Sequence, residues 1–349
     1  MVDPQQELDT VLAEAVPARA AAAAAVIGVD GEIVARSGVG ETVRYADAKG
    51  TVASERPRAD VNTVYDLASL TKVYTTVAAL VMTQQGRMDL DRPVRAWLPE
   101  YVDGEVTVRH LLTHTAGLPA GVGLRGTEPD IRRDMLMSTA PEARPGKTHR
   151  YSDVSFILLG WALETAADET LDQLMDSLIL TPLGLTDTGY GPVTPADRAA
   201  ATEYKNGVLR QGVVHDETAF LLGGACGHAG LFGTVDDVWR FSEALRTGDL
   251  LTPETTRDML RCHVRADGFG QGLGVRRDDP AVTGSLSGSF GHTGFTGTSL
   301  VVDVDRAVSV VLTTNRVHPV RTRAGVNPVR CAITDIAYRA QRRKHAGTS

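Results

Sequence analysis

The sequence predicts an α/β fold in which an antiparallel sheet, formed from both ends of the chain, is flanked by helices and carries an inserted, mostly helical lobe. Strand-like segments lie near both termini, and helical patterns fill the middle. The 349 residues also exceed the ~250–300 at which a single core usually stops growing. We therefore expect one interleaved unit, with residues 1–67 and 220–349 in the sheet lobe, residues 68–219 in the helical lobe, and the active site at their interface.

The N-terminal elements are a helix followed by strands. Residues 5–16 place apolar side chains at helical spacing, namely Leu8, Val11, Leu12 and Val16. Segments 22–29, 32–37 and 43–46 are strand-like and are joined by Gly and Asp turns. The apolar run before Asp30-Gly31 is similar to a secretion signal, but the turn and the strand pattern after it favour a first β-strand. We therefore expect a cytoplasmic protein.

The middle of the chain has helical periodicity, and the last third returns to strands. A long helix is expected over 70–85, with shorter ones over 106–113, 155–165 and 170–180. Segments 297–304 and 307–314 predict a hairpin around Asp305-Arg306, and a helix over 327–344 closes the chain. The stretch 120–147, rich in Gly, Pro and Arg, is expected to be an irregular connection near the cleft.

Composition excludes several classes of function. The net charge of −7 and the pI of about 5.7 give no general attraction to nucleic acid. No apolar run reaches the ~18–20 residues that a membrane span needs. The sparse cysteines, Cys226, Cys262 and Cys331, lack metal-type spacing, so we expect reduced thiols. The sequence predicts neither a nucleic-acid nor a membrane partner.

A serine and a lysine at the start of the predicted long helix are the first candidates for chemistry. Ser69 and Lys72 are three residues apart, so their side chains face the same way. A serine hydroxyl needs a neighbouring base, and a lysine amine can serve when its pKa is lowered. The helix N-terminus adds N–H donors where an oxyanion would form. The pair alone is weak evidence, because roughly one Ser-x-x-Lys arises by chance in a chain of this length.

Two further motifs follow in order along the chain. Tyr151-Ser152-Asp153 precedes a helical pattern, and Gly291-His292-Thr293-Gly294-Phe295 precedes a strand. With Ser69-Leu70-Thr71-Lys72 they correspond to Ser-x-x-Lys, Tyr-x-Asn and Lys-Thr-Gly. The sequence thus resembles the serine β-lactamase and penicillin-binding-protein superfamily, especially the class C branch with its esterase- and transacylase-type relatives. The resemblance extends over residues 20–340 and includes the phrases at 111–119, 181–185 and 227–232.

The resemblance implies a β-lactamase/transpeptidase-like fold and an acyl-enzyme mechanism. Ser69 would attack a carbonyl, and Lys72 and Tyr151 would handle its proton, with the formal base left open. A free tyrosine has a pKa of about 10, so a nearby ammonium is the physical means of stabilising a phenolate. The oxyanion would lie between the backbone N–H groups of Ser69 and Phe295. The resemblance assigns substrate binding to Asp153, His292, Thr293 and Gly294.

Two positions depart from the family pattern. His292 stands where many members have Lys, and a histidine is only partly protonated near neutral pH. We therefore expect weaker attraction for a substrate carboxylate, as found in penicillins and D-Ala-D-Ala peptides. Asp153 stands where Asn is usual; an ionised carboxylate cannot donate to a substrate carbonyl but can pair with Lys72. Both changes argue against a dedicated β-lactamase and leave acyl transfer intact.

Other features have structural explanations. His110 and His114 have the spacing of zinc ligands, but the zinc-protease Glu and a third ligand are missing, so helix packing and capping explain them better. His228 is expected to brace the cleft wall, and Trp97, Trp161 and Trp239 to lie in the core or between the lobes. The Gly-rich segments 221–233 and 268–274 lack the strand–Gly–helix order of a nucleotide site. The sequence predicts no metal and no organic cofactor.

The leading interpretation is a serine hydrolase of the esterase or amidase type. It would act on a small-molecule ester, thioester or amide through an acyl-Ser69 intermediate. The alternative is a transacylase of natural-product biosynthesis, in which an amine or alcohol acceptor replaces water. A third hypothesis is a non-catalytic ligand-binding or sensor module, which would tolerate loss of Ser69, Lys72 or Tyr151, whereas all three residues are present.

Overall fold

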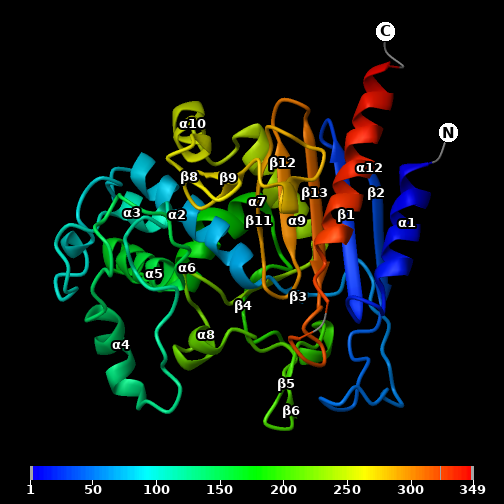
Figure 1. Cartoon of the computed structure of the whole chain (residues 1–349), viewed down its shortest axis with the longest axis horizontal. Helices are drawn as coiled ribbons and strands as arrows, with labels where there is room; N and C mark the ends of the chain where they lie inside the picture. Colours follow the sequence, from blue (N-terminus) through cyan, green and yellow to red (C-terminus); the bar gives the residue numbers. More distant parts are fainter. Residues whose placement is uncertain (1–2, 323, 347–349) are drawn as a thin grey trace.

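A large antiparallel sheet forms one side of the molecule and a group of helices the other (Figure 1). The structure, a computed structural model, describes residues 3–322 and 324–346. The sheet has eight strands in the order β2-β1-β13-β12-β11-β10-β9-β8. Their bounds are β1 (Ala22–Val29), β2 (Glu32–Gly40), β8 (Val264–Ala266), β9 (Phe269–Gln271), β10 (Arg276–Arg277), β11 (Phe290–Thr293), β12 (Ser299–Asp303) and β13 (Val308–Thr314). The predicted fold class is confirmed.

Strand β1 joins the two ends of the chain in the sheet. It pairs with β2 on one side and with β13 on the other, where Ala23 lies opposite Thr314. Both of its faces are buried, so its residues are apolar throughout, and alternate side chains enter different cores. Ala23, Ala25 and Ile27 pack under α1 (Pro4–Ala15) and α12 (Asn327–Ala346), while Val26 faces the core shared with the helical side.

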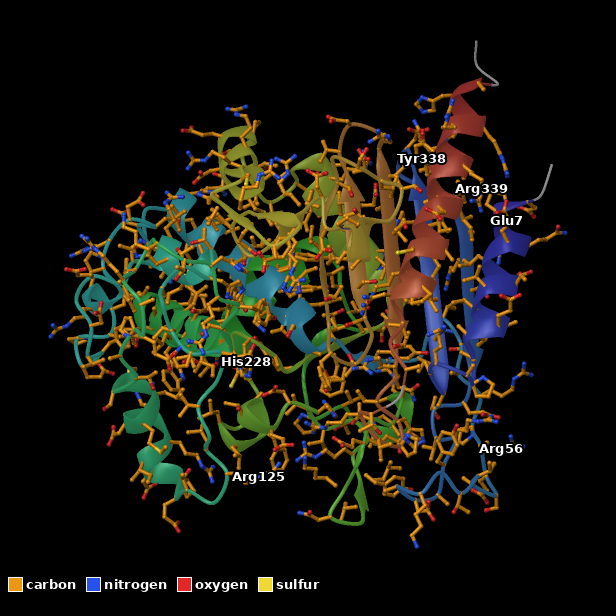
Figure 2. The ribbon with its side chains drawn as sticks, viewed as in Figure 1. Glu7, Arg56, Arg125, His228, Tyr338 and Arg339 are labelled. Atoms are coloured by element: carbon orange, nitrogen blue, oxygen red, sulfur yellow. The ribbon has the colours of Figure 1, made fainter. Side chains whose placement is uncertain are left out.

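Helices cover both faces of this sheet. In Figure 1, α1 and α12 lie together on the outer face, and α9 (Val235–Thr247) lies on the inner face against β12 and β13. Glu7 of α1 forms ion pairs with Arg339 and Arg343 of α12, and Figure 2 shows Glu7 and Arg339 facing each other across the two helices. The terminal helices thus hold each other as well as the sheet.

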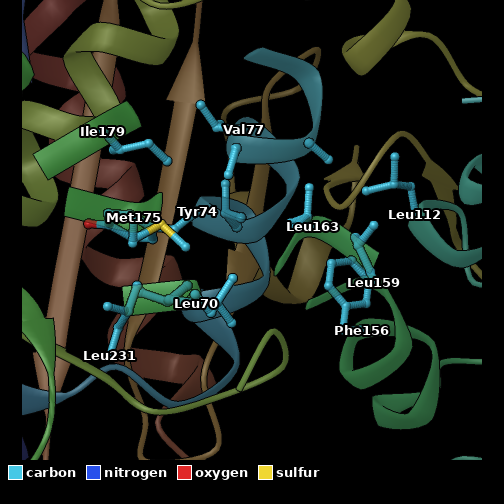
Figure 3. Packing of buried hydrophobic residues seen from close by; sticks show 14 of the residues in the cluster. Leu70, Tyr74, Val77, Leu112, Phe156, Leu159, Leu163, Met175, Ile179 and Leu231 are labelled. Atoms are coloured by element: carbon cyan, nitrogen blue, oxygen red, sulfur yellow. The ribbon is translucent and has the colours of Figure 1, made fainter. Parts of the chain in front are cut away.

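The helical side is built around α2 (Thr71–Gln84), which is buried along most of its length. Figure 3 shows Leu112 and Phe156 on one side of α2 and Met175 and Ile179 on the other. Tyr74 of α2 stacks on Phe241 of α9, with ring centroids 3.8 Å apart, which ties this core to the sheet. The other helices are α3 (Val108–Leu112), α4 (Pro129–Met137), α5 (Asp153–Ala167), α6 (Leu171–Met175), α7 (Thr181–Leu183), α8 (Glu217–Leu221), α10 (Pro253–Leu260) and α11 (Pro280–Thr283).

Short strands connect the two sides. A three-stranded sheet has the order β3-β7-β4, and β5 pairs with β6. Their bounds are β3 (Tyr65–Asp66), β4 (Gly189–Tyr190), β5 (Tyr204–Lys205), β6 (Val208–Leu209) and β7 (Leu231–Gly233). Strand β3 is followed by Leu67, by a 3-10 helix over Ala68–Leu70 that contains Ser69, and then by α2, so this small sheet fixes where the long helix begins. In residues 3–322 and 324–346 no helix combines the length and apolar character needed to cross a membrane.

Two sequence-based expectations about elements are wrong in detail, and a third is confirmed with a local change of helix type. Residues 43–46 form no strand; only Tyr45 makes an isolated bridge, to Val52, because the segment lies in a polar surface loop. The stretch 120–147 contains α4, which begins at Pro129, a residue suited to the first turn of a helix. The helix expected over 170–180 is α6 followed by a wider π-turn over Asp176–Leu180.

Candidate active site

The turn that carries Ser69 is strained and braced from both sides. Ala68, just before the serine, has a φ of 49° in the left-handed region. The carboxylate of Asp66 accepts the Ala68 N–H at 2.8 Å with one oxygen and the His215 N–H at 2.6 Å with the other. Thr298 Oγ1 donates to the Leu67 carbonyl at 2.9 Å from the hairpin after β11. Ser69 is thus held at the N-terminal end of α2, where backbone donors gather.

Lys72 is fully buried one turn further along and contacts three oxygen atoms. Its Nζ lies 3.0 Å from Ser69 Oγ and 3.1 Å from the His228 carbonyl oxygen. The carboxylate oxygen Asp153 Oδ1 lies 2.7 Å from the same Nζ. Burial opposes the charge on Lys72, but the neighbouring Asp153 and Tyr151 outweigh it and raise the pKa of the ammonium above its usual range. Lys72 is therefore a cation beside the serine.

Tyr151 lies close to this cation and to a histidine. Lys72 Nζ is 4.9 Å from the centroid of the Tyr151 ring, and the His114 ring centroid is 4.5 Å from the same centroid. His114 Nδ1 accepts the Ser152 N–H at 3.1 Å, so it also fixes the backbone next to Tyr151. Burial and the charge of Lys72 hold the pKa of His114 well below its ordinary value, so the imidazole is neutral.

The third motif closes the site from the edge of the large sheet. A Cβ at Gly294 would lie 2.6 Å from the Leu67 carbonyl oxygen, so only glycine lets this segment approach the serine turn so closely. Phe295 follows with its side chain 49% exposed and its ring stacked on His215, centroids 5.7 Å apart. Ser69, Tyr151 and His292–Phe295 line one pocket of about 560 Å³. The oxyanion role of the Ser69 and Phe295 N–H groups stays a prediction.

His292 supplies no positive charge to this pocket. Its ring is buried, and Nδ1 donates to the Thr293 carbonyl at 2.9 Å. Burial, together with the nearby Arg276 and Lys72, holds the pKa of His292 well below its ordinary value. The exchange of Lys for His therefore removes a charge from the motif, as expected from the sequence.

Arginines outside the motifs restore that charge. The pocket beside Ser69 is also lined by Arg19, Arg276, Arg316 and Arg330. Arg330 of α12 binds two neutral oxygens, Asn327 Oδ1 at 2.5 Å and the Thr298 carbonyl at 3.0 Å. Burial lowers the pKa of Arg330 to about 10, so it stays charged at neutral pH. Weaker attraction for a carboxylate, expected from the loss of Lys at His292, stays a prediction, and these arginines add positive charge to the same pocket from outside the motif.

A second pocket of about 310 Å³ opens on the other side of Ser69 and Phe295. Its walls combine apolar residues, among them Ala229 and Phe295, with polar and charged ones, which are Arg125, His215, Asp216, Glu217, Thr218 and Arg321. His228 Nε2 lies 2.9 Å from Asp216 Oδ1, and although burial opposes it, this contact holds the pKa of Asp216 below its usual range. His228 thus braces the wall through Asp216 and contacts Lys72 through its carbonyl.

The remaining candidates have structural roles. His110 completes a capping box with Thr107 at the start of α3. Cys226 is buried, and all three cysteines are free thiols. Trp97, Trp161 and Trp239 are partly buried against the main core. Within residues 3–322 and 324–346, no group of three or more His, Cys, Asp or Glu side chains is arranged to hold a metal ion.

The family described as Beta-lactamase matches residues 8–331. The chain belongs to this family. A relative from Escherichia coli (strain K12), named "Putative D-alanyl-D-alanine carboxypeptidase", is 32% identical over 337 residues, covering 83% of this chain and 77% of the relative. A relative of the same name from Salmonella typhimurium (strain LT2) is 30% identical over 345 residues, covering 86% and 79%.

Two solved structures extend the comparison. "EstCE1, a hydrolase with promiscuous acyltransferase activity" matches this β-lactamase family member with a TM-score of 0.77 at 28% identity, covering 96% of this chain and 98% of the other. Simvastatin synthase (LovD) from Aspergillus terreus shares the fold, with a TM-score of 0.77 at 21% identity and 97% and 99% coverage. The protein is thus a serine acyl-enzyme hydrolase or acyltransferase of the β-lactamase and penicillin-binding-protein superfamily.

Proposed function

We propose that this enzyme hydrolyses a small ester or amide through an acyl-Ser69 intermediate. The observation that carries the proposal is the contact of 3.0 Å between Lys72 Nζ and Ser69 Oγ at the junction of two pockets. Ser69 Oγ bonds to the carbonyl carbon while its proton passes to the Lys72–Tyr151 pair. The bond to the leaving group breaks and that proton goes to the leaving oxygen or nitrogen. Water then attacks the carbonyl carbon of the acyl-enzyme and gives a proton to the Lys72–Tyr151 pair. The bond to Ser69 Oγ breaks, the acid is released, and that proton returns to Ser69 Oγ.

We further propose that the substrate carries a carboxylate on the leaving-group side. The cluster of arginines in the larger pocket supports this, because the described residues that line it include four arginines and no Asp or Glu. Of the four, Arg276 is also paired with Asp279, which lies outside the lining. A carboxylate held by guanidinium groups gains charge-assisted hydrogen bonds. The relatives named as D-alanyl-D-alanine carboxypeptidases agree with a substrate of this kind, a peptide with a free C-terminus.

The smaller pocket suggests the character of the acyl group. Charged side chains line it, including Arg125, Asp216 and Glu217. Asp216 is paired with His228 and Glu217 with Arg125. A long alkyl chain would remove these ion pairs from water without adding a hydrogen bond to them. We therefore expect short or polar acyl groups to be preferred over fatty acyl groups.

The test is intact-protein mass spectrometry after brief incubation with p-nitrophenyl acetate, comparing the wild type with Ser69→Ala. A mass increase on the wild type alone supports acyl-Ser69, and the variant should release p-nitrophenol only at the uncatalysed rate. Circular dichroism of Ser69→Ala checks that the fold is retained. Equal turnover by the variant would contradict the proposal. A wild type that forms no adduct and releases no p-nitrophenol would also contradict it and would favour the binding-module hypothesis.

Transacylation is the second candidate, and the 28% identity to a hydrolase with promiscuous acyltransferase activity favours it. Both reactions share the acylation of Ser69, so the acceptor decides between them. Added amines or alcohols should accelerate deacylation and give an amide or ester product if the enzyme transfers acyl groups. Release of the free acid alone, at a rate independent of acceptor, would identify a hydrolase.

A further inference from the structure

Asp153 occupies the position where the family pattern has an amide. It begins α5, and its side chain is 36% exposed while that of Lys72 is completely buried. The distance of 2.7 Å between Asp153 Oδ1 and Lys72 Nζ makes an ion pair of a carboxylate with a buried amine. An amide at this position would give a neutral contact, so this chain carries an additional negative charge next to the lysine.

The other groups around Lys72 do not oppose its positive charge strongly. The His228 carbonyl and Ser69 Oγ are neutral acceptors. His114 and His292 are neutral because their pKa values are held well below ordinary values. Asp216, on the wall of the smaller pocket, is ionised and adds a more distant negative charge. A neutral Lys72 would leave the Asp153 carboxylate without its counter-charge.

A second cation is placed beside Tyr151. The Arg276 guanidinium lies 5.6 Å from the centroid of the Tyr151 ring, on β10. The Lys72 ammonium lies 4.9 Å from the same centroid. The charge of Lys72 is shared with Asp153, and Arg276, which is also paired with Asp279, places a second positive charge beside the Tyr151 ring.

We propose that Asp153 is a positioning residue that keeps Lys72 an ammonium, so that Lys72 donates to Ser69 Oγ and Tyr151 accepts the serine proton. The inference rests on the proposed function, because it concerns the acylation of Ser69. In this step the Ser69 O–H bond breaks, its proton forms a bond to the Tyr151 phenolate oxygen, and Ser69 Oγ bonds to the carbonyl carbon. Tyr151 then returns the proton to the leaving group, while Lys72 neither gains nor loses one.

The kinetic test compares the pH dependence of acylation by p-nitrophenyl acetate in the wild type and Asp153→Asn. The burst of p-nitrophenol is followed from about pH 5 to about pH 10, with the Ser69→Ala background subtracted. The wild-type rate should rise to a plateau without an alkaline fall. The Asp153→Asn rate should fall above a new alkaline limit, about tenfold per pH unit, because Lys72 has lost the partner that kept it charged.

If Lys72 instead acts as the general base, the pH profile of Asp153→Asn should change in the opposite direction. If Lys72 were the base, Asp153→Asn would release it, and the rate would increase at neutral pH and keep rising with pH. Either that result or an unchanged profile would overturn the inference. Asp130→Asn removes one charge from the exposed face of α4 and is the matched control, with a wild-type profile expected.

A direct measurement keeps the inference testable if Asp153→Asn does not fold. The ¹⁵N NMR signal of Lys72 Nζ, assigned with Lys72→Met, should stay that of an ammonium in the wild type up to about pH 10. A neutral-amine shift near pH 8 would overturn the inference. Failure of the wild type to form any acyl adduct would instead contradict the proposed function, and the two failures are thereby distinguishable.

Discussion

Arg330 links the C-terminal helix to the pocket beside Ser69, and its removal should alter substrate preference. Arg330→Gln keeps a donor for the Thr298 carbonyl but removes the charge. We expect kcat/KM for a peptide with a free C-terminal carboxylate to fall about ten- to hundredfold, since a hydrogen bond to a charged group contributes about 1.5–3 kcal/mol. The same peptide with a C-terminal amide is the control and should change little. An equal loss for both substrates would contradict a carboxylate-binding role.

The sequence predicted which motif residues lie together better than it predicted the residues that surround them. Ser69 and Lys72 meet because helical spacing brings them together, and the motif order pointed to Tyr151 and Asp153. The arginines of the pocket come from separate segments of the chain, so no local pattern groups them. His114 was seen as a packing residue, and its contact with Ser152 depends on a backbone turn with positive φ.

Among the elements, the turn before α2 depends on the two oxygens of Asp66. Each accepts a different backbone N–H, so an amide would turn its own N–H₂ toward one of these donors. Asp66→Asn should therefore lower the free energy of unfolding by about 1–3 kcal/mol, the cost of an unsatisfied buried group. Urea denaturation measures this, with Asp60→Asn at an exposed turn as the control. Equal stability of both variants would show that the brace is dispensable.

The approach of β11 to the serine turn makes a second prediction at this scale. Gly294→Ala places a methyl group 2.6 Å from the Leu67 carbonyl oxygen and 2.1 Å from Thr298 Oγ1. We expect a loss of about 1–3 kcal/mol in stability and slower acylation of Ser69, because the hairpin must move away from it. Thermal unfolding and burst kinetics measure both effects. Gly121→Ala is the matched control, since nothing lies within 4 Å of its added Cβ.

Helices and strands with a clear pattern of apolar residues were predicted well from the sequence. Segments whose conformation depends on tertiary contacts were not. The strands around Ala22–Val29 and Val308–Thr314 have long apolar patterns and agree closely with the structure. Residues 43–46 have a similar pattern without a partner strand, so they form a loop. The turn at Asp176–Leu180 widens where it packs against α2, and a sequence period does not report such a contact.

For the whole molecule, the ion pairs around the smaller pocket should make the free energy of unfolding depend on pH in the acidic range. Hydrogen bonds from Lys205 and Arg125 hold the pKa of Glu217 at about 2, below its ordinary 4.5. The contribution of the Glu217 carboxylate to the free energy of unfolding is therefore complete above pH 4.5, its ordinary pKa, and is lost as the pH falls toward 2. After allowance for solvent screening it is about 1–2 kcal/mol. Urea unfolding of Glu217→Gln should depend less on pH in this range than the wild type, and Glu254→Gln should match the wild type.

The pairing of Ala23 with Thr314 also means that the large sheet can be completed only after nearly the whole chain has been synthesised. During synthesis, β1 emerges from the ribosome almost three hundred codons before β13, the strand with which it pairs. The segment around Gly294, which approaches the serine turn, also emerges late. The helical side gathers mostly local contacts and can fold earlier. The contacts that complete the pocket beside Ser69 are therefore among the last that the growing chain can form.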